Sequence, residues 1–405
     1  MKKVLIATLM AYSAIGAFAQ TEVVKDATNA MKGKSPDYQA IVNQLKPAFT
    51  NPETATDAET WVLAGKASIA LYDNLYKMQA IGQDVDAPLM GNSLMDGIEY
   101  YITALPYDSV PDAKGKIKTK YSKDIVKQVK DNYNQLNNLG ATLYNAKDFN
   151  GAYRAWDMFL TLPKNPVLGA NAPAALPDTI MADIAFNKGI AAWQADSADR
   201  ALSAFQQAIS LGYNKKQVYD YAIAIAAQNG KNDVVTALAT QAYPIFGDED
   251  PKFLQLMIND KIEKKQYDEA RSMLNEAIAA SPENPQLYFV LGILEETLEN
   301  NDAALADYQK AIQLDPNYAQ GQYAVGRTIC NLAYALDDKA GQGTTQAEYM
   351  EIRNNQVNPM FKEAATYLEK AYELDPENMH DALRYLRNVY YNLGDEENLK
   401  RVESL

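Results

Sequence analysis

Few residues in this chain of 405 have the types and spacing that catalysis needs. One histidine, His380, and one cysteine, Cys330, are all that a histidine-based triad, a thiol nucleophile or a His/Cys metal site could draw on. Gly33–Ser35 resembles the end of a phosphate-binding loop but lacks its first glycine, and Asp84–Asp86 is too short for a calcium loop. The many carboxylates fit solvated helix faces. We therefore expect no catalytic residue, no metal, no cofactor and no enzyme.

A row of lysines is instead a candidate contact surface. Its members recur every three or four residues, which places them within ~40° of one line on a helix. They face away from Ile117, Tyr121, Ile125 and Val129, so the pattern predicts an amphipathic, lysine-rich helix over 114–131. This ridge is either a contact for anions, including self-association with an acidic patch of a second copy, or a solvated face. The lysines are Lys116, Lys120, Lys123, Lys127 and Lys130.

Composition narrows the classes of partner. The formal net charge is −14, which disfavours nucleic acid and anionic membrane surfaces. Hydrophobic residues make up 47% of the chain, enough for a buried core, whereas glycine (20) and proline (17) are scarce for a protein built from many strands and turns. The composition predicts a folded, mainly helical protein.

Residues 1–19 have the form of a cleavable signal peptide. Lys2 and Lys3 precede a mostly apolar stretch, and Ala17–Ala19 gives the small-x-small pattern cut by signal peptidase. Cleavage after Ala19 leaves Gln20, which cannot carry the lipid that a cysteine would. We expect export to the periplasm, with secretion as an alternative, and no membrane span.

Small residues recur along the chain with a period of 34. Ala270 and Ala304 are separated by this step, as are Ala277 and Ala311. Gly292 and Gly326 repeat on the preceding helices, where a missing side chain lets a neighbouring helix approach, and Tyr308 or Leu274 fills the space between. Prolines such as Pro282 and Pro316 end each second helix. In these positions the sequence resembles the tetratricopeptide repeat family, and in particular exported bacterial proteins with many such repeats.

The resemblance implies an all-α fold, a right-handed superhelical solenoid of helix hairpins with two prolonged hairpins and a C-terminal capping helix. We expect seven repeats over 58–393. Before them, Ser35-Pro36 predicts the start of one helix. The expected divisions are a signal peptide (1–19), an extension with one helix (20–57), irregular repeats with the lysine-rich helix (58–250), regular repeats (251–393) and a cap (394–405).

Two insertions interrupt the period. Residues 163–178 contain four prolines and predict a loop. Residues 331–359 are mostly helix formers around Gly341–Gly343, so we expect both helices of the last hairpin to be prolonged, each by ~13 residues. The first hairpin is expanded in the same way around Gly82–Gly91.

The resemblance also implies a concave face, lined by the first helix of each repeat, that binds an extended peptide or an apolar helix. We therefore expect a non-catalytic extracytoplasmic scaffold for a protein or peptide partner; the alternatives are a glycan-binding or envelope-associated outer-membrane accessory protein, and, for the side chains themselves, simple packing between repeats. The family's inward positions fall on Phe186, Ile190, Trp193, Gln255, Asn259, Ile262, Phe289, Ile293, Glu296, Tyr323 and Arg327.

Overall fold

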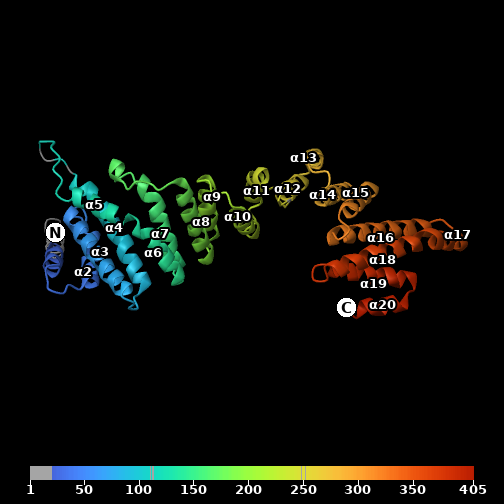
Figure 1. Cartoon of the computed structure of the whole chain (residues 1–405), viewed down its shortest axis with the longest axis horizontal. Coiled ribbons are helices and arrows are strands. Elements are labelled where there is room, and N and C mark those ends of the chain that lie inside the picture. The colour runs from blue at the N-terminus through green and yellow to red at the C-terminus, as the bar shows by residue number, and fades with distance from the viewer. Residues whose placement is uncertain (1–20, 110, 112–113, 248, 251) are drawn as a thin grey trace, which may run out of the picture. The chain divides into compact units, whose positions relative to one another are not determined.

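The chain is all-α in the computed structural model, which describes residues 21–109, 111, 114–247, 249–250 and 252–405 (Figure 1). The predicted signal peptide lies outside the described residues. Within them, the one pairing of the strand type is an isolated bridge between Pro111 and Ile117. No helix in the described ranges combines the length and the apolar character that crossing a bilayer requires.

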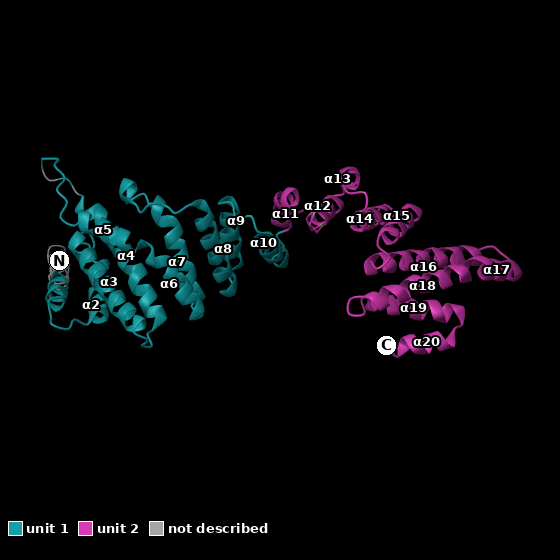
Figure 2. Ribbon diagram, viewed as in Figure 1, with its two compact units in different colours: residues 1–231 teal, residues 232–405 magenta. Residues whose placement is uncertain are grey.

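The helices form two compact units, which meet in sequence between Lys231 and Asn232 (Figure 2). The division falls between α10 and α11, the two helices of the degenerate repeat at 216–246. Unit 1 contains α2 (Tyr38–Leu45), α3 (Ala58–Ala80), α4 (Ala87–Asp108), α5 (Ser122–Tyr133), α6 (Gln135–Asn145), α7 (Phe149–Thr161), α8 (Asp178–Gln194), α9 (Ala198–Ser210) and α10 (Lys216–Gln228). Unit 2 contains α11 (Asn232–Phe246), α12 (Lys252–Glu263), α13 (Tyr267–Ala280), α14 (Pro285–Thr297), α15 (Asn301–Leu314), α16 (Ala319–Gly341), α17 (Gln346–Ile352), α18 (Asn358–Leu374), α19 (His380–Leu393) and α20 (Glu396–Glu403).

Consecutive helices pack as hairpins because a glycine on the first accepts a large side chain from the second. A Cβ atom on Gly292 would lie 2.5 Å from the ring of Tyr308, and one on Gly189 would lie 2.5 Å from the ring of Phe205. Gly326 meets Leu368 in the same way, at 2.7 Å. The predicted role of these small residues is confirmed.

The alanines that define the period are buried in these hairpins. Ala270, Ala304 and Ala311 have no exposed surface, and neither do Leu274 and Tyr308, the large residues between them. The core of each repeat thus consists of two closely packed helices with one large side chain between them. The next repeat covers its remaining apolar face.

The last hairpin is prolonged, as predicted. Helix α16 has 23 residues against 13 in α14. The second arm of this hairpin consists of α17, a π-helical turn at Arg353–Val357 and α18. Arg353 in that turn donates to Asp337 at 2.6 Å and to the hydroxyl of Tyr349 at 2.8 Å, which ties the extra turns to α16. Helix α19 follows, and α20 lies in the predicted cap at 394–405.

The first hairpin is also prolonged, with 23 residues in α3 and 22 in α4. The inserted segment 163–178 is a loop with two short 3₁₀ turns, at Leu162–Lys164 and Gly169–Asn171. The other predicted break, at Gly341–Gly343, separates α16 from α17.

Three expectations for the helices are wrong. The N-terminal extension holds a helix at residues 21–30 besides α2, and α2 starts after Asp37, whose carboxylate accepts from the N–H of Ala40, rather than at Ser35. The lysine-rich helix begins at Ser122 and not near 114. The carboxylate of Asp108, at the end of α4, accepts the backbone N–H groups of Lys120, Tyr121 and Ser122 and fixes this start.

Candidate partner-binding surfaces

The predicted inward residues of unit 1 lie on α8 and differ in how much surface they offer. Phe186 stacks on Tyr213, with ring centroids 4.6 Å apart, so one face of its ring is used in packing. Ile190 lines a hollow of about 270 Å³ together with Trp156. Trp193 is 38% exposed and is the member of this set most open to a partner.

In unit 2, two of the predicted residues, Glu296 and Arg327, bond to each other, and a third, Tyr323, packs against another ring. Glu296 on α14 accepts from Arg327 on α16 at 2.6 Å and from the hydroxyl of the buried Tyr308 at 2.8 Å. Burial first, and Glu296 second, raise the pKa of Tyr308. The ring of Tyr323 lies edge-on to Tyr385 at 6.0 Å. These contacts hold α14, α15, α16 and α19 together. For Glu296, Tyr323 and Arg327 they favour packing between repeats, the alternative to binding a partner.

The remaining predicted residues divide between surface and core. Asn259 on α12 is exposed. Ile262 and Ile293 are half-buried against the apolar clusters of unit 2. Gln255 and Phe289 are different, because the fold brings them together around a hollow.

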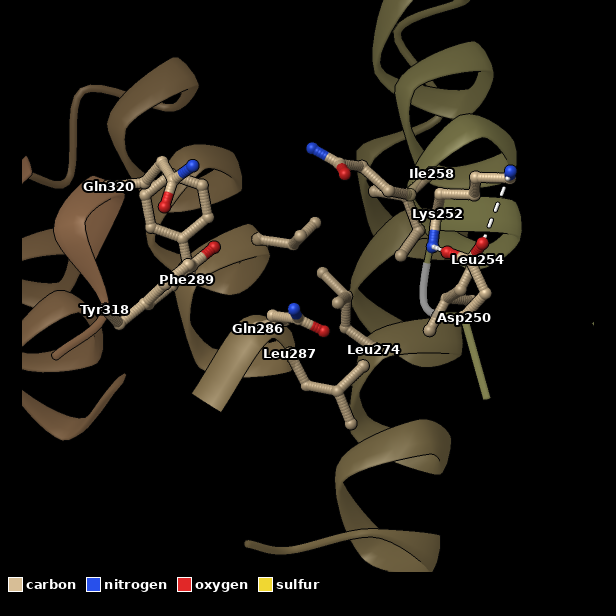
Figure 3. A pocket seen from close by; sticks show the side chains of 12 residues that line it. Asp250, Lys252, Leu254, Ile258, Leu274, Gln286, Leu287, Phe289, Tyr318 and Gln320 are labelled. Atoms are coloured by element: carbon tan, nitrogen blue, oxygen red, sulfur yellow. Dashed lines mark hydrogen bonds and ion pairs between the residues drawn. The ribbon is translucent and has the colours of Figure 1, made fainter. Parts of the chain in front are cut away.

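That hollow is a pocket of about 480 Å³ between α12, α13, α14 and the start of α16. Its floor is apolar: Leu254, Ile258, Leu274 and Leu287 are each at most 5% exposed. Figure 3 shows Tyr318 and Gln320 on one side, the ion pair of Asp250 and Lys252 on the other, and Leu274 and Leu287 between them. We call this the glutamine-rimmed pocket.

The rim is formed by Gln255, Gln286 and Gln320, from α12, α14 and α16. Within the described ranges, the side-chain amides of these three residues form no hydrogen bond to the protein. An amide carries both donors and an acceptor, so the rim matches the N–H and C=O groups of an extended backbone, while the floor accepts an apolar side chain.

Sequence reasoning selected Gln255 and Phe289 but missed Gln286, Gln320 and Tyr318. The signal was available in the period. Lys252, Gln286 and Gln320 occupy one repeat position, and Gln255 and Phe289 occupy another. Two positions carried through successive repeats therefore build the pocket.

Comparison with known proteins identifies the repeat. Residues 256–337, which run from α12 into α16, match a family model described as "Tetratricopeptide repeat". This segment belongs to the tetratricopeptide repeat family. No curated protein matches the chain.

Solved structures of tetratricopeptide repeat proteins are among the matches. A repeat protein from Bacteroides fragilis is 19% identical, with 64% of this chain and 98% of that one covered and a TM-score of 0.34. One from Parabacteroides merdae is 14% identical, with 63% and 98% covered and a TM-score of 0.35. PilF of Pseudomonas aeruginosa is 13% identical, with 56% and 90% covered and a TM-score of 0.38.

The lysine row lies outside the identified tetratricopeptide repeats and is divided by the late start of α5. Lys123, Lys127 and Lys130 lie on the helix, whereas Lys116 and Lys120 precede it. Lys127 pairs with Asp131 at 2.6 Å and Lys120 with Glu59 at 3.5 Å. The predicted apolar face holds for Ile125 and Val129, each 1% exposed, but Ile117 is 54% exposed.

The one cysteine and the one histidine do not lie in an arrangement typical of a catalytic or metal site. Cys330 is fully buried on α16, and burial raises the pKa of its thiol to about 11. A thiol with this pKa is a poor nucleophile near neutral pH. His380 is exposed at the first turn of α19. Among the described residues, no three acidic, histidine or cysteine side chains are grouped to hold a metal ion.

Proposed function

We propose that this protein is a non-catalytic scaffold that binds an extended segment of a partner protein in the glutamine-rimmed pocket of unit 2, and that it works outside the cytoplasm. One observation carries the binding proposal. Three glutamine amides from three different helices surround an apolar floor and have no bond to the protein within the described residues.

The size and chemistry of the pocket favour a peptide. About 480 Å³ holds one or two side chains with their backbone, and free amides pair with main-chain groups without selecting a charge. The tetratricopeptide repeat fold is one that binds other proteins through its helix faces, which agrees with this geometry.

A glycan would need a different surface. Sugar rings stack on flat, exposed aromatic faces. In this pocket Phe289 contacts Tyr318 edge-on, with centroids 5.2 Å apart, and Tyr308 at 5.6 Å, so its ring is used in packing. The glycan-binding alternative has no such observation in its favour.

The extracytoplasmic location rests on the sequence of residues 1–19 alone. Its basic start, apolar centre and Ala17–Ala19 site support export with cleavage after Ala19.

Selection of peptides from a random displayed library tests the binding proposal. We expect enriched peptides with one apolar anchor, and about tenfold weaker binding to the double variant Gln286→Ala/Gln320→Ala, because two amide hydrogen bonds are lost. The matched control is Gln309→Ala/Gln313→Ala, two exposed glutamines on α15. Peptides that bind all three proteins equally, or a library that yields none, would contradict the proposal.

A further inference from the structure

A second pocket, of about 300 Å³, lies in unit 1 between α3, α4 and α5. It belongs to the first, prolonged hairpin and to the helix that follows it, so it is separate from the glutamine-rimmed pocket. None of the residues selected from the concave-face pattern lines it. We call it the α3–α5 pocket.

A mostly buried tyrosine, Tyr101, lines the α3–α5 pocket with a hydroxyl that has no hydrogen-bond partner in the described part of the chain. Tyr101 on α4 is 3% exposed, and its ring rests on the backbone of Gly65, where a Cβ atom would lie 2.7 Å away. The hydroxyl oxygen is therefore open to a hydrogen-bond donor that enters the pocket.

Two carboxylates from different helices flank this hydroxyl. Asp73 of α3 and Asp124 of α5 both line the α3–α5 pocket, and neither forms a hydrogen bond or ion pair through its side chain within the described ranges. Their electrostatic effect reaches Tyr101: burial first, then Asp124 and Asp73, raise the pKa of its hydroxyl to about 12. Burial also raises the pKa of Asp73 and outweighs the nearby charge of Lys77, which lowers it.

The walls and rim limit what could enter. Val62, Ile69 and Ile125 are between 1% and 6% exposed and give the pocket an apolar wall. Lys127 at the rim forms an ion pair with Asp131, which raises its pKa most, and the charge of Asp124 raises that pKa further. Lys66 also lines the pocket and lies seven residues before Asp73 on α3, ~10 Å along the helix axis.

We propose that the α3–α5 pocket binds a primary ammonium or guanidinium group carried on an aliphatic stem. Asp73 and Asp124 pair with the positive charge, the hydroxyl oxygen of Tyr101 accepts one of its hydrogen bonds, and Val62, Ile69 and Ile125 pack against the stem. A lysine or arginine side chain of a partner and a free alkylamine share this chemistry.

Titration calorimetry on the full chain with pentylammonium and with pentylguanidinium tests the proposal, with 1-pentanol as the uncharged probe of the same stem. We expect both cations to bind and 1-pentanol not to bind measurably. Asp73→Asn should weaken cation binding about tenfold, and Tyr101→Phe, which keeps the ring on Gly65, about fivefold, since a charge-assisted hydrogen bond is worth more than a neutral one.

The control is Asp84→Asn, which makes the same change of charge at an exposed turn of unit 1 and should leave binding unchanged. Thermal melts by circular dichroism establish that each variant is folded. A tripeptide with a central lysine, blocked at both ends, and its acetyl-lysine form separate the two sources: binding of the lysine form alone identifies a partner's side chain, and binding of pentylammonium alone identifies a free amine. The proposal is overturned if no cation binds, if 1-pentanol binds equally, or if Asp73→Asn and Tyr101→Phe leave binding unchanged.

Discussion

At the scale of single residues, the fold depends on a missing side chain. Gly292 allows the ring of Tyr308 to lie directly on the backbone of α14, and the same relation joins Gly189 to Phe205. The ring of Tyr308 is fully buried, and its hydroxyl reaches Glu296 at 2.8 Å. One residue pair thus sets both the distance between two helices and the position of a buried hydrogen bond.

The variant Gly292→Ala should therefore destabilise unit 2. Its Cβ atom would lie 2.5 Å from the ring of Tyr308, so the helices must separate or the ring must move, at a cost of about 1–3 kcal/mol. Urea unfolding followed by circular dichroism measures the change. Gly341→Ala is the control, because its new Cβ atom meets nothing within 4 Å. Equal stability of the two variants would show that the close approach is not required.

Asp307 gives a prediction for the dependence of stability on pH. Burial first, and Glu295 second, raise the pKa of this carboxyl to about 6. Since the unfolded value is 3.8, protonation of Asp307 stabilises the fold fully below that pH, and this contribution is lost as the pH rises through about 6.

The variant Asp307→Asn should thus be more stable than the parent at about pH 7.5, by about 1 kcal/mol because solvent still reaches the site, and equally stable near pH 3.5. Urea unfolding at several pH values tests this. Asp338→Asn, an exposed change of the same charge on α16, is the control. A difference between Asp307→Asn and the parent that does not vary with pH would refute the assignment.

At the scale of elements, sequence reasoning succeeded where the signal was local. The period that carries Gly292, Ala304 and Tyr308 predicted the hairpins, and Gly341–Gly343 predicted the break in the last one. The start of α5 could not be found in this way, because the group that fixes it, Asp108, belongs to the preceding helix. The spacing of the lysines continues before the start of α5, so it predicted a helix that was too long at this end.

The variant Asp108→Asn tests that account. Its carboxylate accepts three backbone N–H groups and the hydroxyl of Ser122. Burial alone would raise the pKa of Asp108, but these bonds outweigh it and lower the pKa. The stability they supply is present above the unfolded pKa and is lost as the pH falls through the folded one.

We expect Asp108→Asn to cost about 1–2 kcal/mol near neutral pH and to reduce amide protection at the first turn of α5. Hydrogen exchange read by mass spectrometry locates the change. Protection should be unaltered in α8 and α9 of the same unit, which serve as the internal control. Unchanged exchange at residues 120–125 would mean that Asp108 does not fix this boundary.

The glutamine-rimmed pocket shows the same division between local and distant information. Gln255 and Phe289 were selected because they occupy an inward position of the family in two successive repeats. Gln286 and Gln320 become pocket residues only because successive repeats stack with their first helices adjacent. Examining the position three residues before the selected one, occupied by Lys252, Gln286 and Gln320, would have found them.

At the scale of the whole molecule, the account requires that the protein leaves the cytoplasm and meets its partner there. We expect the protein recovered from cells to begin at Gln20, and Ala19→Arg to leave residues 1–19 attached, because signal peptidase accepts small residues at that position. Intact-mass measurement of cell fractions decides this. The control is Gln20→Ala, which should still be cleaved. A native protein that retains Met1 would contradict export by this route.

The central claim is that a partner protein docks at the glutamine-rimmed pocket. Its most direct test is a photo-crosslinking amino acid placed at Gln286 in living cells, with the same group at Gln309 on α15 as the matched exposed control. The account predicts a discrete protein adduct from position 286, absent from 309 and reduced by Gln320→Ala. No adduct from 286, or the same adduct from both positions, would contradict it.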